Sequence, residues 1–86
     1  MTTVGFTPKF LKMLKKVEPD IQEKAFQKLE LFKDTRNHKS LEVHKLHGKF
    51  SDKYGFSVTH KIRIVFQYLE KNHTVMLSIG DHDVYK

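Results

Sequence analysis

The spacing of apolar residues changes partway along this chain, from a helical period to a strand period. Between residues 8 and 32 the apolar side chains recur every three or four positions, as they do in amphipathic helices that bury one face. Between residues 56 and 79 apolar and polar side chains alternate, as they do in strands whose two faces differ. We therefore expect an α+β fold, with two N-terminal helices packed on one face of an antiparallel sheet.

The expected helices have clear start and stop signals. Thr7-Pro8 is typical of a helix N-cap followed by a proline at the first helical position. Pro19 ends this helix and opens the next one. The apolar stripes that should enter the core are Phe10, Leu11, Leu14 and Val17 in the first helix and Ile21, Ala25, Phe26, Leu29 and Phe32 in the second.

The strands are expected to complete the order β-α-α-β-β-β. A short strand at Val4-Gly5-Phe6 precedes the helices, and a three-strand meander follows residue 55. The helices should cover the meander face that carries Ile64 and Phe66, so Arg63 should project from the opposite face. Residues 41–50 suggest an extended lead-in with a bend at Gly48. The apolar positions of the meander are Phe56, Val58, Ile62, Ile64, Phe66, Tyr68, Val75, Leu77 and Ile79.

Size and composition limit the classes of function. The chain has 86 residues, and we expect residues 1–86 to form a single domain. The absence of cysteine excludes disulfides and thiolate metal sites. No apolar stretch approaches the ~20 residues of a membrane span, so we expect a soluble cytoplasmic protein with no membrane partner.

Positive charge concentrates in the middle of the chain. The net charge is +6, and residues 37–63 carry six basic and two acidic side chains, which gives +4. A basic excess of this kind attracts polyanions through counterion release, so we expect contact with nucleic acid or the ribosome. The side chains expected to make this contact are Lys45, His47, Lys49, Lys53 and Lys61. We assign His38, His60 and His73 to exposed loops and turns.

Histidine and arginine together indicate acid–base chemistry on a phosphate. His44 and His47 form a His-x-x-His pair, and Asp81, His82 and Asp83 could complete a metal site, although a bare pair of histidines is weak evidence. We expect no metal and no cofactor. Leu46 should anchor this segment to the core and thereby fix His44, which can exchange a proton near neutral pH. Arg63 carries a permanent positive charge on an expected strand, and a rigid strand is well suited to position a group that binds phosphate.

The chain ends in a second polar segment. Gly80-Asp81-His82-Asp83-Val84-Tyr85 follows the last expected strand. His82 can donate or accept a proton, and nearby carboxylates would favour its charged, acidic form. Tyr85 can stack on a base or orient a phosphate. A polar tail without function is the alternative.

Several of these segments resemble one family. His44-Lys45-Leu46-His47-Gly48 resembles its "[H/x]-x-L-x-G" element. Tyr54–Val58 followed by Ile62-Arg63-Ile64-Val65-Phe66 resembles its "Y-x-x-x-V" and "R-I-V/I-F" strands, and Ile79–Tyr85 resembles its "I-G-x-H-D-x-x-Y" ending. The chain is thus similar, over nearly its whole length, to RelE/ParE superfamily toxins of type II toxin–antitoxin systems.

The resemblance implies a bacterial toxin with a RelE-like microbial RNase fold. It implies a cognate antitoxin that covers the active face in a toxin–antitoxin hetero-oligomer. In the RelE, HigB, YafQ and YoeB branches it implies a metal-independent endoribonuclease, an mRNA interferase that cleaves mRNA on the ribosome. In the ParE branch it implies inhibition of DNA gyrase without nuclease chemistry.

The resemblance also suggests residue roles for the nuclease reading. Arg63 matches the strand arginine that stabilises the scissile phosphate, and His82 and Tyr85 match the histidine and the aromatic residue near the end. His44 matches the histidine of the HigB and YafQ branches. The glutamate base of the YoeB branch has no counterpart, because Ser40 falls near its place and Glu42 is offset, whereas Lys45 and Lys49 could replace the lysines of RelE.

The sequence thus predicts a ribosome-dependent endoribonuclease toxin. His44 would take the proton of a ribose 2′-OH, and Arg63, helped by Lys45 or Lys49, would stabilise the phosphorane. His82 would protonate the leaving oxygen, and Tyr85 would orient the nucleotide. The alternatives are a ParE-like toxin that inhibits gyrase, and a decayed toxin that persists as an antitoxin-binding module. The number of histidines favours the nuclease, since a pure binder has no need of titrating groups.

Overall fold

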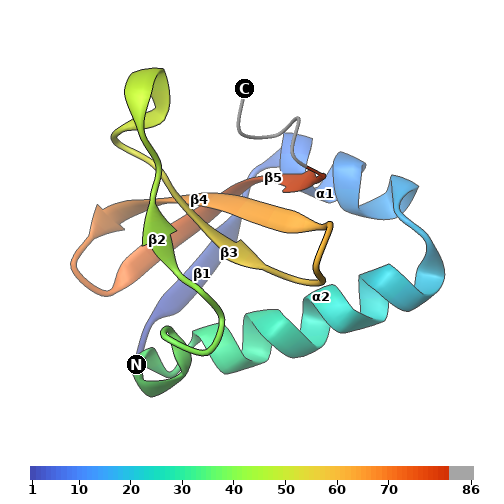
Figure 1. The fold of residues 1–86 in the computed structure, drawn as a ribbon, viewed down its shortest axis with the longest axis horizontal. Coiled ribbons are helices and arrows are strands. Elements are labelled where there is room, and N and C mark those ends of the chain that lie inside the picture. Colours follow the sequence, from blue (N-terminus) through green and yellow to red (C-terminus); the bar gives the residue numbers. More distant parts are fainter. Residues whose placement is uncertain (82–86) are drawn as a thin grey trace.

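Within residues 1–81 the protein has two α-helices and a five-stranded mixed sheet (Figure 1). The structure is a computed structural model that describes residues 1–81, with Phe50 as backbone alone. The elements in chain order are β1 (Thr3–Phe6), α1 (Pro8–Lys16), α2 (Pro19–Phe32), the 3₁₀ helix η1 (Thr35–Asn37), β2 (His44–Lys45), the 3₁₀ helix η2 (Gly48–Phe50), β3 (Tyr54–Ser57), β4 (Arg63–Glu70) and β5 (His73–Gly80). The expected fold class is confirmed.

The helix boundaries follow the signals in the sequence. The Thr7 hydroxyl accepts a hydrogen bond from the Phe10 amide (3.0 Å) and so caps α1, and it also donates to the Met76 carbonyl (3.1 Å) on β5. Glu18 is extended, as a residue before proline tends to be, and Pro19 then opens α2. The start of α1 is therefore fixed both to its own first turn and to the sheet.

The sheet has the strand order β1-β5-β4-β3-β2. Strand β1 runs parallel to β5, and every other neighbouring pair is antiparallel. The sheet therefore has one strand more than expected and a parallel pair at one edge. The extra strand is β2, in which His44 pairs with Gly55 and Lys45 pairs with Tyr54. Gly48 has the left-handed φ (69°) that the expected bend requires.

The core lies between the helices and one face of the sheet. Phe32 from α2 is fully buried, stacks on Phe56 with a centroid distance of 4.9 Å and meets Phe66 edge-on at 4.8 Å. The helices thus cover the expected face of the meander. The buried cluster comprises Phe10, Leu14, Ala25, Leu29, Phe32, Leu41, Phe56, Val58, Ile64, Phe66, Met76 and Ile79.

Two expected helix core positions are wrong. Leu11 is 44% exposed and Phe26 is 55% exposed. Leu11 follows the fully buried Phe10, and Phe26 follows the fully buried Ala25. Each exposed side chain therefore points about 100° around the helix axis from a core position. The buried stripe is therefore narrower than the helical spacing alone suggests.

A register shift in the sheet changes which residues of β5 face the core. Phe66 pairs with Met76 but Val65 pairs with Ser78, so one extra residue of β5, Leu77, lies between the two pairs. A bulge of this kind breaks the alternation of faces. As a result Met76 and Ile79 both lie in the core, and the simple alternation of Val75, Leu77 and Ile79 does not hold.

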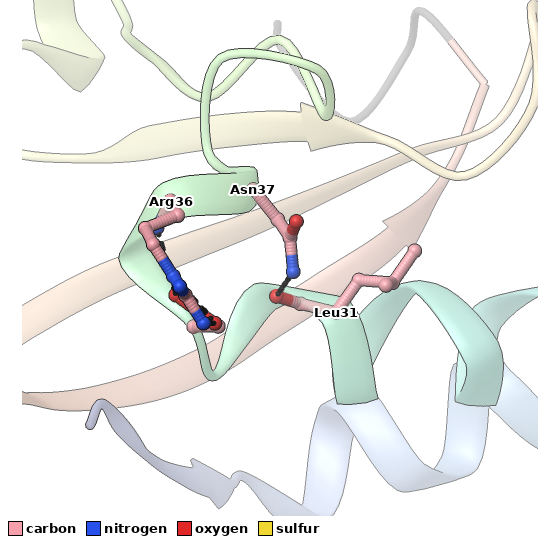
Figure 2. Close-up of polar contacts among 4 residues, drawn as sticks. Leu31, Arg36 and Asn37 are labelled. Carbon is pink, nitrogen blue, oxygen red and sulfur yellow. Dashed lines mark hydrogen bonds and ion pairs between the residues drawn. The ribbon is translucent and has the colours of Figure 1, made fainter.

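The C-terminus of α2 is closed by the residues that follow it. Asn37 reaches back so that its Nδ2 donates to the Leu31 carbonyl (2.9 Å), and the Arg36 guanidinium bonds to the carboxylate of Asp34 (2.7 Å) (Figure 2). Arg36 holds the pKa of the Asp34 carboxyl down at about 2 by hydrogen bonding. This cap directs the chain from the helix toward β2.

His38 belongs to the same cap and is not the exposed loop residue that the sequence suggests. Its Nε2 donates to the Phe32 carbonyl (2.8 Å), since a carbonyl oxygen only accepts, and its ring stacks on the Phe32 ring at 4.6 Å. His38 is thus half-buried and ties the loop to the core.

Candidate functional site

The face of the sheet away from the helices carries two of the predicted site residues. Paired residues on neighbouring strands point to the same face, so the register defines rows across the sheet. One row is His44, Gly55, Val65 and Ser78, and the next is Ser57, Arg63 and Gly80. His44 and Arg63 therefore share a face, as the sequence predicts for Arg63, with only the small residues Gly55 and Ser57 of β3 between their strands.

The backbone separation of His44 and Arg63 follows from the sheet geometry. His44 is on β2 and Arg63 is on β4, with β3 between them, and their rows are two residues apart along the strands. These two offsets give about 12 Å between their Cα atoms. Both side chains extend several ångströms from the backbone.

The orientation of the His44 ring is set by the main chain. His44 is exposed at the edge of the sheet, and its Nδ1 lies 2.7 Å from the carbonyl oxygen of Glu42. A carbonyl oxygen can only accept a hydrogen bond, so Nδ1 carries the hydrogen. In the neutral ring the lone pair that can take a proton is then on Nε2.

Glu42 is a further residue of the site and is not among those that the sequence predicts. It has a φ of 61°, the left-handed region that residues other than glycine rarely adopt. Its carboxylate accepts a hydrogen bond from the Ser57 hydroxyl (3.1 Å), and Ser57 lies opposite Arg63. Glu42 thus contacts both the His44 ring and the row of Arg63, and no sequence signal marks its unusual backbone.

The Arg63 side chain is anchored to the turn between β3 and β4. Its Nη1 donates to the Thr59 carbonyl at 2.7 Å, and the Thr59 hydroxyl accepts from the amides of Lys61 and Ile62 (3.2 and 3.0 Å). The turn therefore fixes the position of Thr59, whose carbonyl oxygen binds the Arg63 guanidinium. A guanidinium has further N–H donors in a planar fork, which suit the oxygens of a phosphate.

The basic residues expected to bind RNA divide into separate groups. His47 and Lys49 are exposed at η2, Lys53 bonds to the Asp52 carboxylate (3.2 Å), and Lys61 is exposed in the β3–β4 turn. Figure 1 shows the η2 loop and this turn at opposite ends of β3. Positively charged side chains thus lie near both ends of β3.

Lys45 does not share the face of His44 and Arg63. Its register partner is Tyr54, which pairs with Phe66 in the row that faces the helices. The help that Lys45 was expected to give Arg63 is therefore not supported by its position, because successive residues of a strand point to opposite faces.

The remaining predicted site residues lie outside the described part of the chain. These are His82 and Tyr85, together with Asp83 of the possible metal set. Within residues 1–81 no group of three or more His, Cys, Asp or Glu side chains could hold a metal ion. Over the same residues, neither helix has the length and apolar character needed to cross a membrane.

No protein-family model matches the sequence, and no curated protein is significantly similar to it. Solved structures, in contrast, are similar over nearly the whole chain. The YoeB–YefM complex from Staphylococcus aureus gives a TM-score of 0.72 at 17% identity, covering 95% of this chain and 98% of that chain. The toxin–antitoxin complex RelBE2 from Mycobacterium tuberculosis gives 0.69 at 18% identity, covering 94% and 98%. YafQ from Escherichia coli gives 0.69 at 11% identity, covering 98% and 97%.

This chain therefore shares the fold of these solved structures. The fold that the resemblance to the RelE/ParE superfamily implies is thus confirmed. At these identities a shared fold does not fix a shared activity, which depends on the residues that this chain places on the fold.

Proposed function

We propose that this protein is the toxin of a toxin–antitoxin pair and that it cleaves mRNA on the ribosome as a metal-independent endoribonuclease. The observation that carries the proposal is an oriented imidazole and an anchored guanidinium on the same face of the sheet, the one away from the helices. His44 offers Nε2 as a base, and Arg63 offers a fixed positive charge across the small residues of β3. The likeness of fold to toxins solved in complexes with antitoxins supports the same reading.

The reaction would use a nucleophile within the substrate. His44 would take the proton of a ribose 2′-OH through Nε2, and the 2′-oxygen would form a bond to the adjacent phosphorus. Arg63 would bind the non-bridging oxygens and stabilise the added negative charge. The bond from phosphorus to the 5′-oxygen would then break, with a proton supplied to that oxygen by His82, and Tyr85 would orient the nucleotide.

An internal nucleophile explains why few groups would suffice. The 2′-oxygen is already placed beside the phosphorus, so the protein would not have to bind and orient a separate water molecule. A base, a cation and an acid would complete the chemistry. The basic residues near the two ends of β3, which are His47, Lys49, Lys53 and Lys61, would contact the phosphates of mRNA and the ribosome.

The cognate antitoxin would act by covering this face. The YoeB–YefM and RelBE2 structures are complexes of toxins with antitoxins, and we propose a hetero-oligomer of the same kind for this chain. An antitoxin segment over His44 and Arg63 would exclude RNA and suppress activity until it is removed.

The test is cleavage of mRNA in a translating extract, mapped by primer extension. Arg63→Ala should lower the rate by about 100-fold or more, the effect of removing one preorganised charge donor. Lys24→Ala is the matched control, because both substitutions change the net charge from +6 to +5 and Lys24 is exposed on α2, which lies on the other face of the sheet. Its rate should stay within about 3-fold of the parent, as expected for a surface substitution away from the site.

Two outcomes would contradict the nuclease proposal. The first is equal cleavage by the Arg63→Ala and parent proteins. The second is growth arrest with intact mRNA and blocked supercoiling by purified gyrase, which is the behaviour of a ParE-like toxin.

A further inference from the structure

We propose that the left-handed backbone of Glu42 selects the tautomer of His44, so that Nδ1 carries the hydrogen and Nε2 is the nitrogen able to take a proton. Glu42 would thus be a positioning residue that acts through its carbonyl oxygen. The catalytic consequence rests on the proposed function of His44 as a base. The tautomer itself is a property of the folded protein and can be measured without any activity.

The strained conformation of Glu42 is held in place from several sides. A non-glycine residue is strained in the left-handed region, so the surroundings have to fix it there. The Glu42 amide donates to the Lys39 carbonyl (3.1 Å), the next amide, that of Val43, donates to the His38 carbonyl (3.0 Å), and the Glu42 carboxylate accepts from Ser57 (3.1 Å). The reversal of the chain at Glu42 is therefore determined by contacts to both the α2 cap and β3.

This reversal aims the Glu42 carbonyl at the histidine ring. The ring nitrogen Nδ1 of His44 lies 2.7 Å from that oxygen, a short distance for a hydrogen bond from nitrogen. The Glu42 carboxylate is directed to Ser57 instead. The main chain and the side chain of Glu42 thus have different partners, and their roles can be separated by mutation.

Glycine and valine at position 42 make the separation possible. Glu42→Gly removes the carboxylate and keeps the left-handed conformation accessible, so the carbonyl should still face Nδ1. Glu42→Val also removes the carboxylate, but a β-branched residue is a severe misfit at positive φ, so the carbonyl should turn away. Glu42→Ala, with a smaller penalty, serves as an intermediate step if the valine variant fails to fold.

The measurement is long-range ¹H–¹⁵N correlation of the imidazole nitrogens in the uniformly labelled full chain, at a pH where the rings are neutral. The His44 signals are assigned by their loss in His44→Gln. We expect the Nδ1–H tautomer in the parent and in Glu42→Gly, and a shift toward the Nε2–H tautomer in Glu42→Val and, to a smaller degree, in Glu42→Ala.

Cleavage assays on the same variants connect the tautomer to catalysis. Glu42→Val should have a kcat about 10-fold or more below that of Glu42→Gly, with little difference in KM, because both variants lack the carboxylate and only the valine variant loses the orientation of the base. A structural effect alone would lower the fraction of folded protein, which circular dichroism reports, without changing the tautomer of the folded fraction.

The possible results separate this inference from the proposed function. An Nε2–H tautomer of His44 in the parent protein, or an Nδ1–H tautomer that persists in a folded Glu42→Val protein, would overturn the role of Glu42. An Nδ1–H tautomer that responds to Glu42 in a protein that cleaves no RNA would sustain the positioning role and overturn the nuclease.

Discussion

Replacing Phe32 by alanine should destabilise the protein more than any other single truncation on α2. Phe32 is fully buried, and its ring contacts those of His38, Phe56 and Phe66 at centroid distances of 4.6, 4.9 and 4.8 Å. Truncating a buried phenylalanine costs about 3–5 kcal/mol, to which aromatic pairs contribute about 0.5–1.5 kcal/mol each. A domain of this size has roughly 5–10 kcal/mol in total, so the loss would be a third or more of the free energy of unfolding.

The assay is urea unfolding followed by far-ultraviolet circular dichroism, because the chain has no tryptophan for fluorescence. Phe26→Ala is the matched control, since it makes the same substitution on the same helix at a residue that is 55% exposed. Its free energy of unfolding should change by no more than about 0.5 kcal/mol. If Phe32→Ala is unfolded without urea, Phe32→Leu keeps an apolar side chain and should cost about 1–3 kcal/mol.

Equal effects of the two alanine substitutions would refute this reasoning. They would mean that Phe26 is buried in solution as well, and that the core stripe of α2 is as wide as the helical spacing suggests. A loss below about 1 kcal/mol at Phe32 would instead show that the stacked rings repack around the cavity.

Three further changes test separate features. Thr7→Ala removes the cap of α1 and its bond to β5 and should cost about 1–2 kcal/mol in the same urea assay, whereas Thr7→Ser should cost less than half of that. In an NMR titration, Arg36→Ala should return the pKa of Asp34 from about 2 toward 3.8. Because this pKa is lowered in the folded protein, the stability that the pair contributes is present above pH 3.8 and is lost as the pH falls toward 2. Burial raises the pKa of Tyr68 above 10.0, so the stability that its protonated form contributes is present below pH 10 and is lost at higher pH. In urea unfolding curves, Tyr68→Phe should remove this decrease in the free energy of unfolding at alkaline pH.

The parts of the fold that depend on local chemistry could be predicted from the sequence. Thr7-Pro8 and Pro19 mark the helix boundaries because a cap and a proline act on their own backbone. Arg63 lies on the face away from the helices because Ile64, its neighbour in the strand, enters the core.

The parts that depend on tertiary pairing could not be predicted. The two-residue strand β2 exists only through its pairing with β3, and the shift at Leu77 depends on how β5 meets β4. The same limit applies to the site. Glu42 looks like an ordinary surface glutamate in the sequence, and its left-handed backbone results from contacts with the α2 cap and Ser57.

The arrangement gives the two proposed catalytic groups different kinds of support. Arg63 begins a central strand and is held by a turn within the same hairpin, so its charge has a fixed place in the sheet. His44 lies on the edge strand, and its ring depends on a loop that runs from the end of α2 through Glu42. A permanent cation needs only a fixed position, whereas a proton carrier also needs the correct tautomer, which a neighbouring carbonyl can impose. The helical layer, although it lies on the other face of the sheet, would thus act on the chemistry through the cap that ends α2.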